Sequence, residues 1–211
     1  MTNDPREIVA RGYNAAATAY SQWLATRVVD AARTKYQERF CQLLPEGSTV
    51  LELGCGGGGP TTERFAQHFA LTGIDISCTQ VELARTRLPS ATFIEADMTR
   101  FVSPPASFDG VAAFYSLIHL PFGELPGMLT RISAWLRPGG LFVGCLGARG
   151  ENEHIEPDWL GGMPMYWSGH TRGDNLRFLQ EAGLVVEEAS NEAHLEDGQE
   201  APFLWLVARK P

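Results

Sequence analysis

The segment VLELGCGGGGP, from Val50 to Pro60, joins a short apolar run to five glycines. Apolar runs of this length, bounded by turn signals, are typical of strands that are buried in a parallel sheet. Glycines that directly follow such a strand allow positive φ and let backbone amides approach a ligand with no Cβ in the way. The segment therefore predicts a strand over Thr49–Leu53, a ligand-binding turn, and a helix that begins near Thr61.

The alternation of strand and helix continues along the chain beyond the glycines. Short β-branched and aromatic runs alternate with helical patterns of about ten residues. We expect strands over Leu71–Ile76, Thr92–Glu95, Phe108–Phe114 and Leu141–Cys145, and helices over Thr61–His68, Thr79–Leu88 and Leu125–Leu136. Such alternation requires right-handed crossovers, which cover both faces of a parallel sheet. The predicted fold is therefore α/β, with a doubly wound, mostly parallel sheet.

The two ends of the chain differ from this repeating pattern. Apolar residues at helical spacing predict an N-terminal helical cap of two or three helices over residues 1–44. After a helix over Thr171–Ala182, strand-like runs at Leu184–Ala189 and Phe203–Arg209 flank an acidic turn, Glu192–Glu200. Two strands with no helix between them pair as an antiparallel hairpin. We therefore expect the sheet to end in an antiparallel C-terminal hairpin.

Composition and charge exclude several classes of partner. The chain has 211 residues and a formal net charge of -8, with 17 Lys and Arg against 25 Asp and Glu. Nucleic-acid binding needs a concentrated positive surface, and the basic residues here form no run. No apolar stretch reaches the length of a membrane span, and the N-terminus lacks the apolar core of a signal peptide. We therefore expect a cytoplasmic protein that binds neither nucleic acid nor membrane.

The cysteines and histidines give no metal-binding pattern. Cys41, Cys55, Cys78 and Cys145 include no CxxC pair, and the histidines match no zinc spacing. We expect no metal site and no disulfide framework, which agrees with a reducing compartment.

Acidic residues stand at the ends of three predicted strands. Glu52 precedes the glycines, where it can organise the loop around an amino-acid ammonium group. Asp75 follows the glycines by about twenty residues, the separation that places a carboxylate on ribose hydroxyls. Asp97 could accept a hydrogen bond from an adenine amine, while Met98 could pack on its ring. Phe114 ends the fourth strand at the same edge of the sheet, so one ligand is expected to contact all of these ends.

A glycine turn does not by itself distinguish nicotinamide dinucleotides, flavins and S-adenosylmethionine. Glu52 favours S-adenosylmethionine, because this strand end is normally apolar in a dinucleotide fold. The other residues also have purely structural interpretations. Asp75 and Asp97 could cap the following helix or turn, and Met98 could be part of the core.

The segments ELGCGGG, GIDIS, EADM, FDGVAAFYSLIHL and LRPGGLF occur in this order between Glu52 and Phe142. With them, the sequence resembles the class I (Rossmann-like) S-adenosylmethionine-dependent methyltransferase family, of the small-molecule type. The resemblance implies S-adenosylmethionine as cofactor and S-adenosylhomocysteine as product. Tyr20 is similar to a tyrosine that some small-molecule members fold over the cofactor. The cofactor-binding candidates are Tyr20, Glu52, Gly54, Gly56, Asp75, Ile76, Asp97, Met98 and Phe114.

The resemblance also implies roles along the cofactor and a division of the chain. Gly54 and Gly56 are expected beside the methionine portion, Asp75 on the ribose, and Asp97 with Met98 at the adenine. We expect a single methyltransferase domain over residues 1–211. Its parts are a helical cap over 1–44, a cofactor-binding core over 48–147, an acceptor-side loop over 148–170, and a helix with the terminal hairpin over 171–211.

The chemistry is expected to involve few side chains. Methyl transfer from a sulfonium needs alignment and exclusion of water, and a base helps where the acceptor carries a proton. His119, just after the fourth strand, is the candidate general base or acceptor-orienting group, although it could instead pack at the start of a helix. In the aromatic stretch before His170, Tyr166 and Trp167 are the candidate substrate-binding residues. That stretch could instead be a hydrophobic plug over the sheet edge.

Three functions remain open from the sequence. The first is methyl transfer to O, N or S of a small-molecule acceptor. The second is a non-transferring S-adenosylmethionine-binding regulator or fold relative, because fold does not fix function. The third is a nicotinamide oxidoreductase on a similar sheet.

Overall fold

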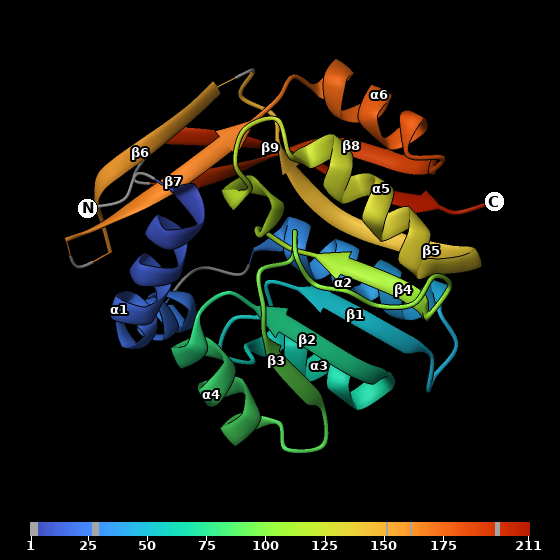
Figure 1. The fold of residues 1–211 in the computed structure, drawn as a ribbon, viewed down its shortest axis with the longest axis horizontal. Helices are drawn as coiled ribbons and strands as arrows, with labels where there is room; N and C mark the ends of the chain where they lie inside the picture. Colours follow the sequence, from blue (N-terminus) through green and yellow to red (C-terminus); the bar gives the residue numbers. More distant parts are fainter. Residues whose placement is uncertain (1–3, 27–29, 151, 161, 197–198) are drawn as a thin grey trace.

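The computed structural model describes residues 4–26, 30–150, 152–160, 162–196 and 199–211. Within these ranges, a seven-stranded sheet has the order β3-β2-β1-β4-β5-β9-β8 (Figure 1). Its strands are β1 (Thr49–Leu53), β2 (Ala70–Asp75), β3 (Thr92–Glu95), β4 (Phe108–Ala113), β5 (Leu136–Gly147), β8 (Val185–Glu196) and β9 (Gln199–Arg209). The first five are parallel, and β9 is antiparallel to both of its neighbours. The predicted fold class, including the antiparallel C-terminal hairpin, is confirmed.

The strand order reverses between β1 and β4. From β1 the chain proceeds outward to β2 and β3, and then returns to place β4 and β5 on the other side of β1. β1 and β4 pair in parallel, with Val50 opposite Gly110 and Glu52 opposite Ala112. In open α/β sheets, the carboxyl ends of the strands at such a reversal form the ligand crevice.

Helices cover both faces of the sheet. They are α1 (Pro5–Thr26), α2 (Ala31–Leu43), α3 (Pro60–His68), α4 (Cys78–Arg87), a short 3-10 helix η1 (Leu117–His119), α5 (Leu125–Trp135) and α6 (Arg172–Glu181). Figure 1 shows α5 and α6 on the near face and α2 and α3 behind the sheet. The predicted N-terminal cap consists of two helices, α1 and α2.

Polar residues begin three of the helices. Asp30 accepts a hydrogen bond from an amide in the first turn of α2, and Ser77 does the same for α4. Thr171 caps α6 in the same way. Such caps satisfy amides that have no partner within the helix. α3 instead starts with Pro60, whose fixed φ suits the first helical position directly after the glycines.

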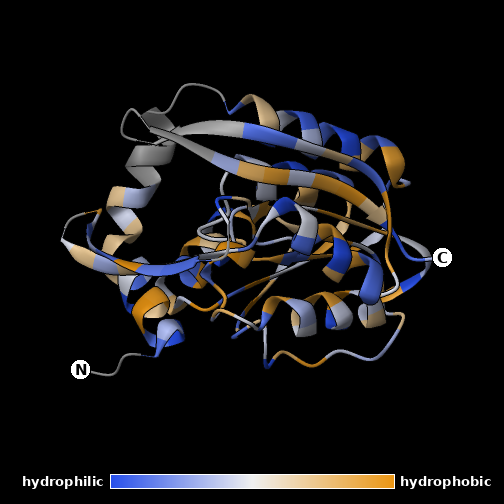
Figure 2. Cartoon of the chain, turned by 90° about the horizontal axis from the view of Figure 1, so that it is seen from above, coloured by the Kyte–Doolittle hydropathy of each residue, from blue (hydrophilic) through white to orange (hydrophobic). Residues whose placement is uncertain are grey.

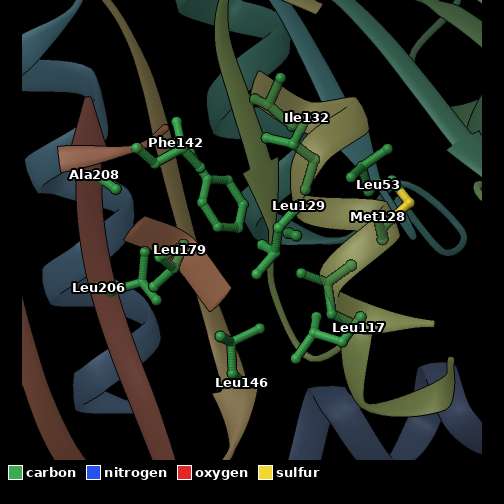
Figure 3. Packing of buried hydrophobic residues seen from close by; sticks show 14 of the residues in the cluster. Leu53, Leu117, Met128, Leu129, Ile132, Phe142, Leu146, Leu179, Leu206 and Ala208 are labelled. Carbon is green, nitrogen blue, oxygen red and sulfur yellow. The ribbon is translucent and has the colours of Figure 1, made fainter. Parts of the chain in front are cut away.

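The hydrophobic core has a layer on each face of the sheet. Figure 3 shows the near layer, in which Leu129 of α5 packs close to Phe142 of β5. In the other layer, Phe40 of α2 packs edge-on against Phe65 of α3, with 5.2 Å between ring centres, and Trp205 of β9 lies in the same cluster. Figure 2 shows that the surrounding helices alternate between hydrophilic and hydrophobic segments, as expected for helices with one buried side.

Helix α1 lies apart from these layers, across the edge toward which the parallel strands point (Figure 1). The side chain of Asn14 accepts hydrogen bonds from the Ser77 hydroxyl at 2.7 Å and the Thr79 amide at 3.2 Å, which joins α1 to the start of α4. Ile8 and Val9 of α1 are buried in a separate small cluster. The helix is therefore placed to cover the carboxyl ends of the strands.

The predicted acceptor-side loop over 148–170 is wrong, because most of this segment forms a second, two-stranded sheet. β6 (Asn152–Trp159) and β7 (Met163–Gly169) pair antiparallel. Met165 and Tyr166 of β7 are buried against α1, which gives the hairpin its apolar face. The exposed strand β6 is polar and acidic, so its sequence lacks the alternation that identifies a half-buried strand.

Two segments expected outside the strands are also part of them. Residues 137–140, between the helix expected to end at Leu136 and the strand expected to begin at Leu141, belong to β5, where a register shift in the β4 pairing accommodates the irregular backbone. The acidic turn expected over Glu192–Glu200 is mostly strand, because β8 and β9 stay paired as far as Glu196 and Gln199. The connecting residues 197–198 lie outside the described residues. In the part of the chain that is described, no helix has both the length and the apolar character needed to cross a bilayer.

Truncation of a core side chain between α5 and the sheet should destabilise the protein strongly. Ile132 is fully buried in this layer, so Ile132→Ala is expected to lower the free energy of unfolding by about 2–5 kcal/mol. Val102, which is 83% exposed, supplies the control. Val102→Ala should change stability by less than about 0.5 kcal/mol in the same urea titration. Equal effects of the two substitutions would contradict the described core.

Candidate functional site

A pocket opens at the carboxyl ends of the parallel strands, beneath helix α1. It encloses about 710 Å³, including the part that is open to solvent. Most of the predicted site residues line it: Tyr20, Gly54, Gly56, Asp75, Ile76, Asp97, Met98, Phe114 and His119. The structure therefore brings these residues together at the strand-order reversal, and their individual roles toward a ligand stay predictions.

The turn after β1 has a backbone conformation that favours glycine. Gly54 and Gly56 have φ of 74° and 53°. A Cβ on Gly54 would lie only 2.4 Å from the Cβ of Ser116, so the ends of β1 and β4 approach each other closely. Any side chain at position 54 would force these two strand ends apart.

Asp75 connects the end of β2 to this turn. Its Oδ2 accepts a hydrogen bond from the amide of Gly56, and its Oδ1 accepts one from the amide of Ser77, both at 2.9 Å. Burial raises the pKa of Asp75, and the hydrogen bonds from these amides oppose that rise. Asp75 therefore organises the turns on both sides and also lines the pocket. Its structural role as a cap and its predicted role toward a ligand are thus compatible.

Asp97 lies at the end of β3 beside the N-terminus of α1. Its Oδ1 accepts hydrogen bonds from the amide and hydroxyl of Thr99, which stabilises the local turn. Its Oδ2 accepts one from Nε of Arg6 at 3.1 Å, and Arg6 also pairs with Glu124. Among the described residues that line the pocket, Arg6 is the only cation. Two carboxylates neutralise it, so it is poorly suited to bind a further anion.

Glu52 does not line the pocket, although it was predicted to bind the cofactor. Its side chain is 4% exposed between β1 and α3, where its Oε1 accepts a hydrogen bond from the hydroxyl of Thr62 at 3.1 Å. Its Oε2 has no hydrogen-bond partner in the described structure. Burial raises the pKa of Glu52 to about 8, so the carboxyl is mostly protonated at neutral pH. The structure thus places Glu52 behind the glycine turn.

The end of β4 is strained and anchored. Tyr115 has φ of 56°, which is costly for a residue with a large side chain. Its hydroxyl donates to Oδ2 of Asp30 at 2.7 Å, and the Arg33 guanidinium lies 4.8 Å from its ring centre. The next residue, Ser116, lines the pocket with a buried hydroxyl that has no partner among the described residues. The contacts of Tyr115 with Asp30 and Arg33 therefore fix the end of β4, where the Ser116 hydroxyl lies unsatisfied at the pocket wall.

His119 in η1 connects α1 to β7. Its Nδ1 lies 2.8 Å from the carbonyl oxygen of Tyr166, and its Nε2 lies 2.9 Å from the hydroxyl of Tyr13. Because a carbonyl can only accept, the neutral ring carries its hydrogen on Nδ1 and accepts the Tyr13 hydrogen at Nε2. Burial lowers the pKa of His119 to about 4, so the ring is neutral at physiological pH. His119 therefore packs as a structural histidine does and also lines the pocket.

The two predicted substrate-binding residues do not line the pocket. The hydroxyl of Tyr166 accepts a hydrogen bond from the amide of Phe122 at 2.8 Å and donates to Glu153. The ring of Trp167 packs against the His119 ring, with 4.5 Å between centres. Both residues therefore support His119 from the side of the hairpin, and direct contact with an acceptor stays a prediction.

Further residues line the pocket without having been predicted, among them Arg6, Tyr13 and Ser116. A usable signal existed for Tyr13, because it lies two turns before Tyr20 on α1 and so shares its helix face. No sequence signal marks Arg6, because its partners Asp97 and Glu124 are remote in the chain. Ser116 lies within the segment that carries the family resemblance, but serine is common at strand ends and gave no separate signal.

Replacing Glu52 by Gln should change how stability depends on pH. The pKa of this carboxyl is raised from 4.5 to about 8 by folding, so the folded state holds a proton that the unfolded state releases between these values. The contribution of this carboxyl to the free energy of unfolding is therefore fully present below about pH 4.5 and is lost as the pH rises through about 8. Over this window, wild-type should lose on the order of 1–4 kcal/mol more than Glu52→Gln in urea titrations.

A control for this measurement is Glu63→Gln, which makes the same change on the exposed side of α3. The control should follow the wild-type pH dependence. If Glu52→Gln also followed it, the carboxyl of Glu52 would be ionised in the folded protein.

Known proteins are related to this chain mainly over its central part. Residues 50–140 match the family model described as a methyltransferase domain. The 27-O-demethylrifamycin SV methyltransferase of Amycolatopsis mediterranei is 31% identical over 160 residues, which cover 66% of this chain and 58% of that protein. The trans-aconitate 2-methyltransferase of Paracidovorax citrulli is 35% identical over 104 residues, which cover 47% of this chain and 39% of that protein. The chain thus spans less than two thirds of the length of both relatives.

Solved structures share the fold over more of the chain. The 1,6-didemethyltoxoflavin-N1-methyltransferase of Burkholderia thailandensis, solved with 1,6-didemethyltoxoflavin and S-adenosylhomocysteine bound, has a TM-score of 0.71 at 18% identity. The match covers 100% of this chain and 92% of that chain, and at this identity it shows the fold. Residues 50–140 of this chain therefore match a methyltransferase domain, and the chain shares the fold of a solved methyltransferase.

Proposed function

We propose that this chain binds S-adenosylmethionine in the pocket and transfers its methyl group to a small-molecule acceptor at O, N or S. The proposal is carried by the convergence of Gly54, Asp75 and Asp97 on one pocket at the strand-order reversal. The match of residues 50–140 to a methyltransferase domain supports the same cofactor. The names of the two curated relatives describe small-molecule acceptors, which supports the acceptor class.

The chemistry of the pocket wall fits S-adenosylmethionine. The open backbone at Gly54 and Gly56 suits close approach of the methionine portion. The carboxylate of Asp75 suits ribose hydroxyls, and Asp97 with Met98 offers a hydrogen-bond acceptor and an apolar surface to an adenine. Tyr20, Ile76 and Phe114 line the pocket around these groups and add apolar contact.

The zwitterionic end of the cofactor requires a cation and polar hydrogen-bonding groups. Arg33 holds its guanidinium 4.8 Å from the ring centre of the pocket-lining Tyr115 and pairs with Asp30, but it does not itself line the pocket. Ser116, which follows Tyr115 in the chain, has a buried hydroxyl without a partner in the described structure. Such groups normally pair with a ligand or water. We assign Ser116 to the amino-acid end of the cofactor, with Arg33 on the ring of Tyr115 and Glu52 behind the turn in supporting positions.

The chain's own residues align the reactants and exclude water. When bound, the cofactor supplies a methyl group that is activated on a sulfonium and leaves a neutral thioether. Ile8 and Val9 of α1 pack on Met165 and Tyr166 of the hairpin, which closes the side of the pocket opposite the sheet. Exclusion of water and fixed orientation account for much of the rate enhancement in such displacements.

An uncharged acceptor suits the part of the pocket that α1 and η1 form. Val9, Leu120 and Pro121 supply apolar surface there, and Tyr13 and His119 add aromatic rings. The only cation among the described lining residues, Arg6, is neutralised by Asp97 and Glu124. A phosphate-rich acceptor would find no compensating charge on this surface.

Calorimetric titration of the protein with S-adenosylmethionine tests the cofactor assignment. Asp75→Ala should weaken binding by about 1–3 kcal/mol, the cost of leaving buried polar partners unpaired. This corresponds to a Kd that rises by about 5-fold to 150-fold. Asp174→Ala, in the first turn of α6 and outside the pocket lining, is the control and should leave the Kd unchanged. An unchanged affinity of Asp75→Ala for S-adenosylmethionine would show that Asp75 does not bind the ribose.

Two further measurements separate the alternative functions. If NAD stabilised the protein against heat and S-adenosylmethionine did not, the protein would be an oxidoreductase candidate. If S-adenosylmethionine bound but metabolite extracts produced no S-adenosylhomocysteine, the protein would be a non-transferring binder. Formation of S-adenosylhomocysteine that depends on the extract is the expected result.

A further inference from the structure

We propose that Tyr13 is a catalytic residue that takes the proton of an uncharged aromatic hydroxyl acceptor while it passes its own proton to His119. The inference rests on the proposed function, because it names the acceptor class and the proton path of that same site. His119 was expected as a base from the sequence, whereas Tyr13 was not among the predicted residues.

The direction of the hydrogen bonds is determined by a backbone carbonyl. The Tyr166 carbonyl can only accept, so Nδ1 of His119 donates to it at 2.8 Å. Nε2 then carries a lone pair and accepts the hydrogen of the Tyr13 hydroxyl at 2.9 Å. A phenol oxygen also has lone pairs of its own. Tyr13 can therefore accept a hydrogen from a ligand in the pocket as it donates to His119.

Aromatic rings fix the orientation of Tyr13. Its ring lies edge-on to Tyr20, His119 and Trp159, with centres 5.3, 5.4 and 5.1 Å away. Tyr13, Tyr20 and His119 all line the pocket. Edge-on and stacked ring contacts are favourable beyond the burial of area, so a flat aromatic acceptor suits this wall. The same contacts hold the Tyr13 oxygen at a fixed place in the pocket wall.

The pair of Tyr13 and His119 can accept a proton, and a hydroxyl is the nucleophile that needs its proton removed. The acceptor group is therefore a hydroxyl. A neutral amine already presents a lone pair, and a thiol ionises readily near neutral pH. A hydroxyl oxygen becomes a strong nucleophile only as its proton leaves, and a positioned base accelerates such a step. The acceptor is uncharged because Asp97 and Glu124 already neutralise Arg6, the only cation among the described lining residues.

The step balances in atoms and charge. The acceptor oxygen forms a bond to the methyl carbon as the bond between that carbon and the sulfonium sulfur breaks. The acceptor proton moves to the Tyr13 oxygen, and the Tyr13 proton moves to Nε2 of His119. One positive charge is thereby lost at sulfur and one appears on the imidazolium, which the Tyr166 carbonyl stabilises through Nδ1–H. The proton returns to solvent through Tyr13 after the products leave.

The burial of His119 suits this role. Burial lowers the pKa of His119 to about 4, so the ring stays neutral beside a cationic sulfonium. A weak base is sufficient here, because a hydroxyl oxygen that is receiving a methyl group becomes strongly acidic. A base of ordinary pKa would be partly protonated at neutral pH and would repel the cofactor.

Matched small acceptors test the proposal with S-adenosylmethionine as methyl donor. The probes are umbelliferone and para-cresol as hydroxyls, para-toluidine as amine and para-thiocresol as thiol, with the methylated products identified by mass spectrometry. Wild-type protein should methylate the hydroxyl probes in preference to the other two. Tyr13→Phe should lower kcat for the hydroxyls by about 100-fold while KM for S-adenosylmethionine stays within about twofold.

Two controls separate a catalytic role from a structural one. Tyr36→Phe removes a hydroxyl from another buried tyrosine, which packs on Trp205 away from the pocket, and should retain full kcat. His119→Asn combined with Tyr13→Phe should be no slower than Tyr13→Phe alone, because His119 acts through Tyr13. In ¹⁵N NMR spectra of the ligand-free protein, His119 should show a protonated Nδ1, and Tyr13→Phe should shift only its Nε2 resonance.

The outcomes distinguish the two proposals. If wild-type protein failed to bind S-adenosylmethionine, the proposed function itself would fail. If it bound the cofactor but methylated no hydroxyl probe, or preferred the amine or the thiol, only the inference on the acceptor would be overturned. Normal kcat in Tyr13→Phe, or additive losses in the double variant, would remove Tyr13 from the proton path.

Discussion

Asp75 accepts hydrogen bonds from two backbone amides, those of Gly56 after β1 and Ser77 before α4. The carbonyl of Ile74 adjoins this carboxylate and accepts from the amides of Gly54 and Cys55. The end of β2 therefore determines the conformation of the turn after β1. Because a buried carboxylate is costly unless several donors surround it, this arrangement strongly favours a single turn conformation. The open backbone of the pocket depends on that conformation.

Charges in and around the pocket are few or compensated. Glu52 is mostly protonated behind the glycine turn, and His119 is neutral at the opposite wall. Arg6 is neutralised at the rim. A site of this kind provides dipoles and single hydrogen bonds in place of strong fixed charges. Such an environment suits a displacement in which a cationic group loses its charge, because no fixed charge near the reacting atoms must reorganise.

The sequence predicts well the sheet and which residues at the strand ends line the pocket, because both depend on local patterns. The glycines after β1 and the acids Asp75 and Asp97 at later strand ends follow from strand topology alone. The hairpin β6–β7 was missed because its exposed strand is polar and only packing on α1 reveals its apolar side. The pair Tyr13 and His119 depends on contact between elements remote in sequence, which no local pattern encodes.

Helix α1 and the hairpin meet almost backbone to backbone at Gly12, where a Cβ would lie 2.6 Å from Cε of Met165 and 3.1 Å from the carbonyl oxygen of Pro164. Neither element belongs to the seven-stranded sheet that carries the glycine turn. Mutations on this contact therefore alter one wall of the pocket and leave the other intact. In evolutionary terms, such a division lets small changes where the helix meets the hairpin reshape one wall of the pocket while the glycine turn persists.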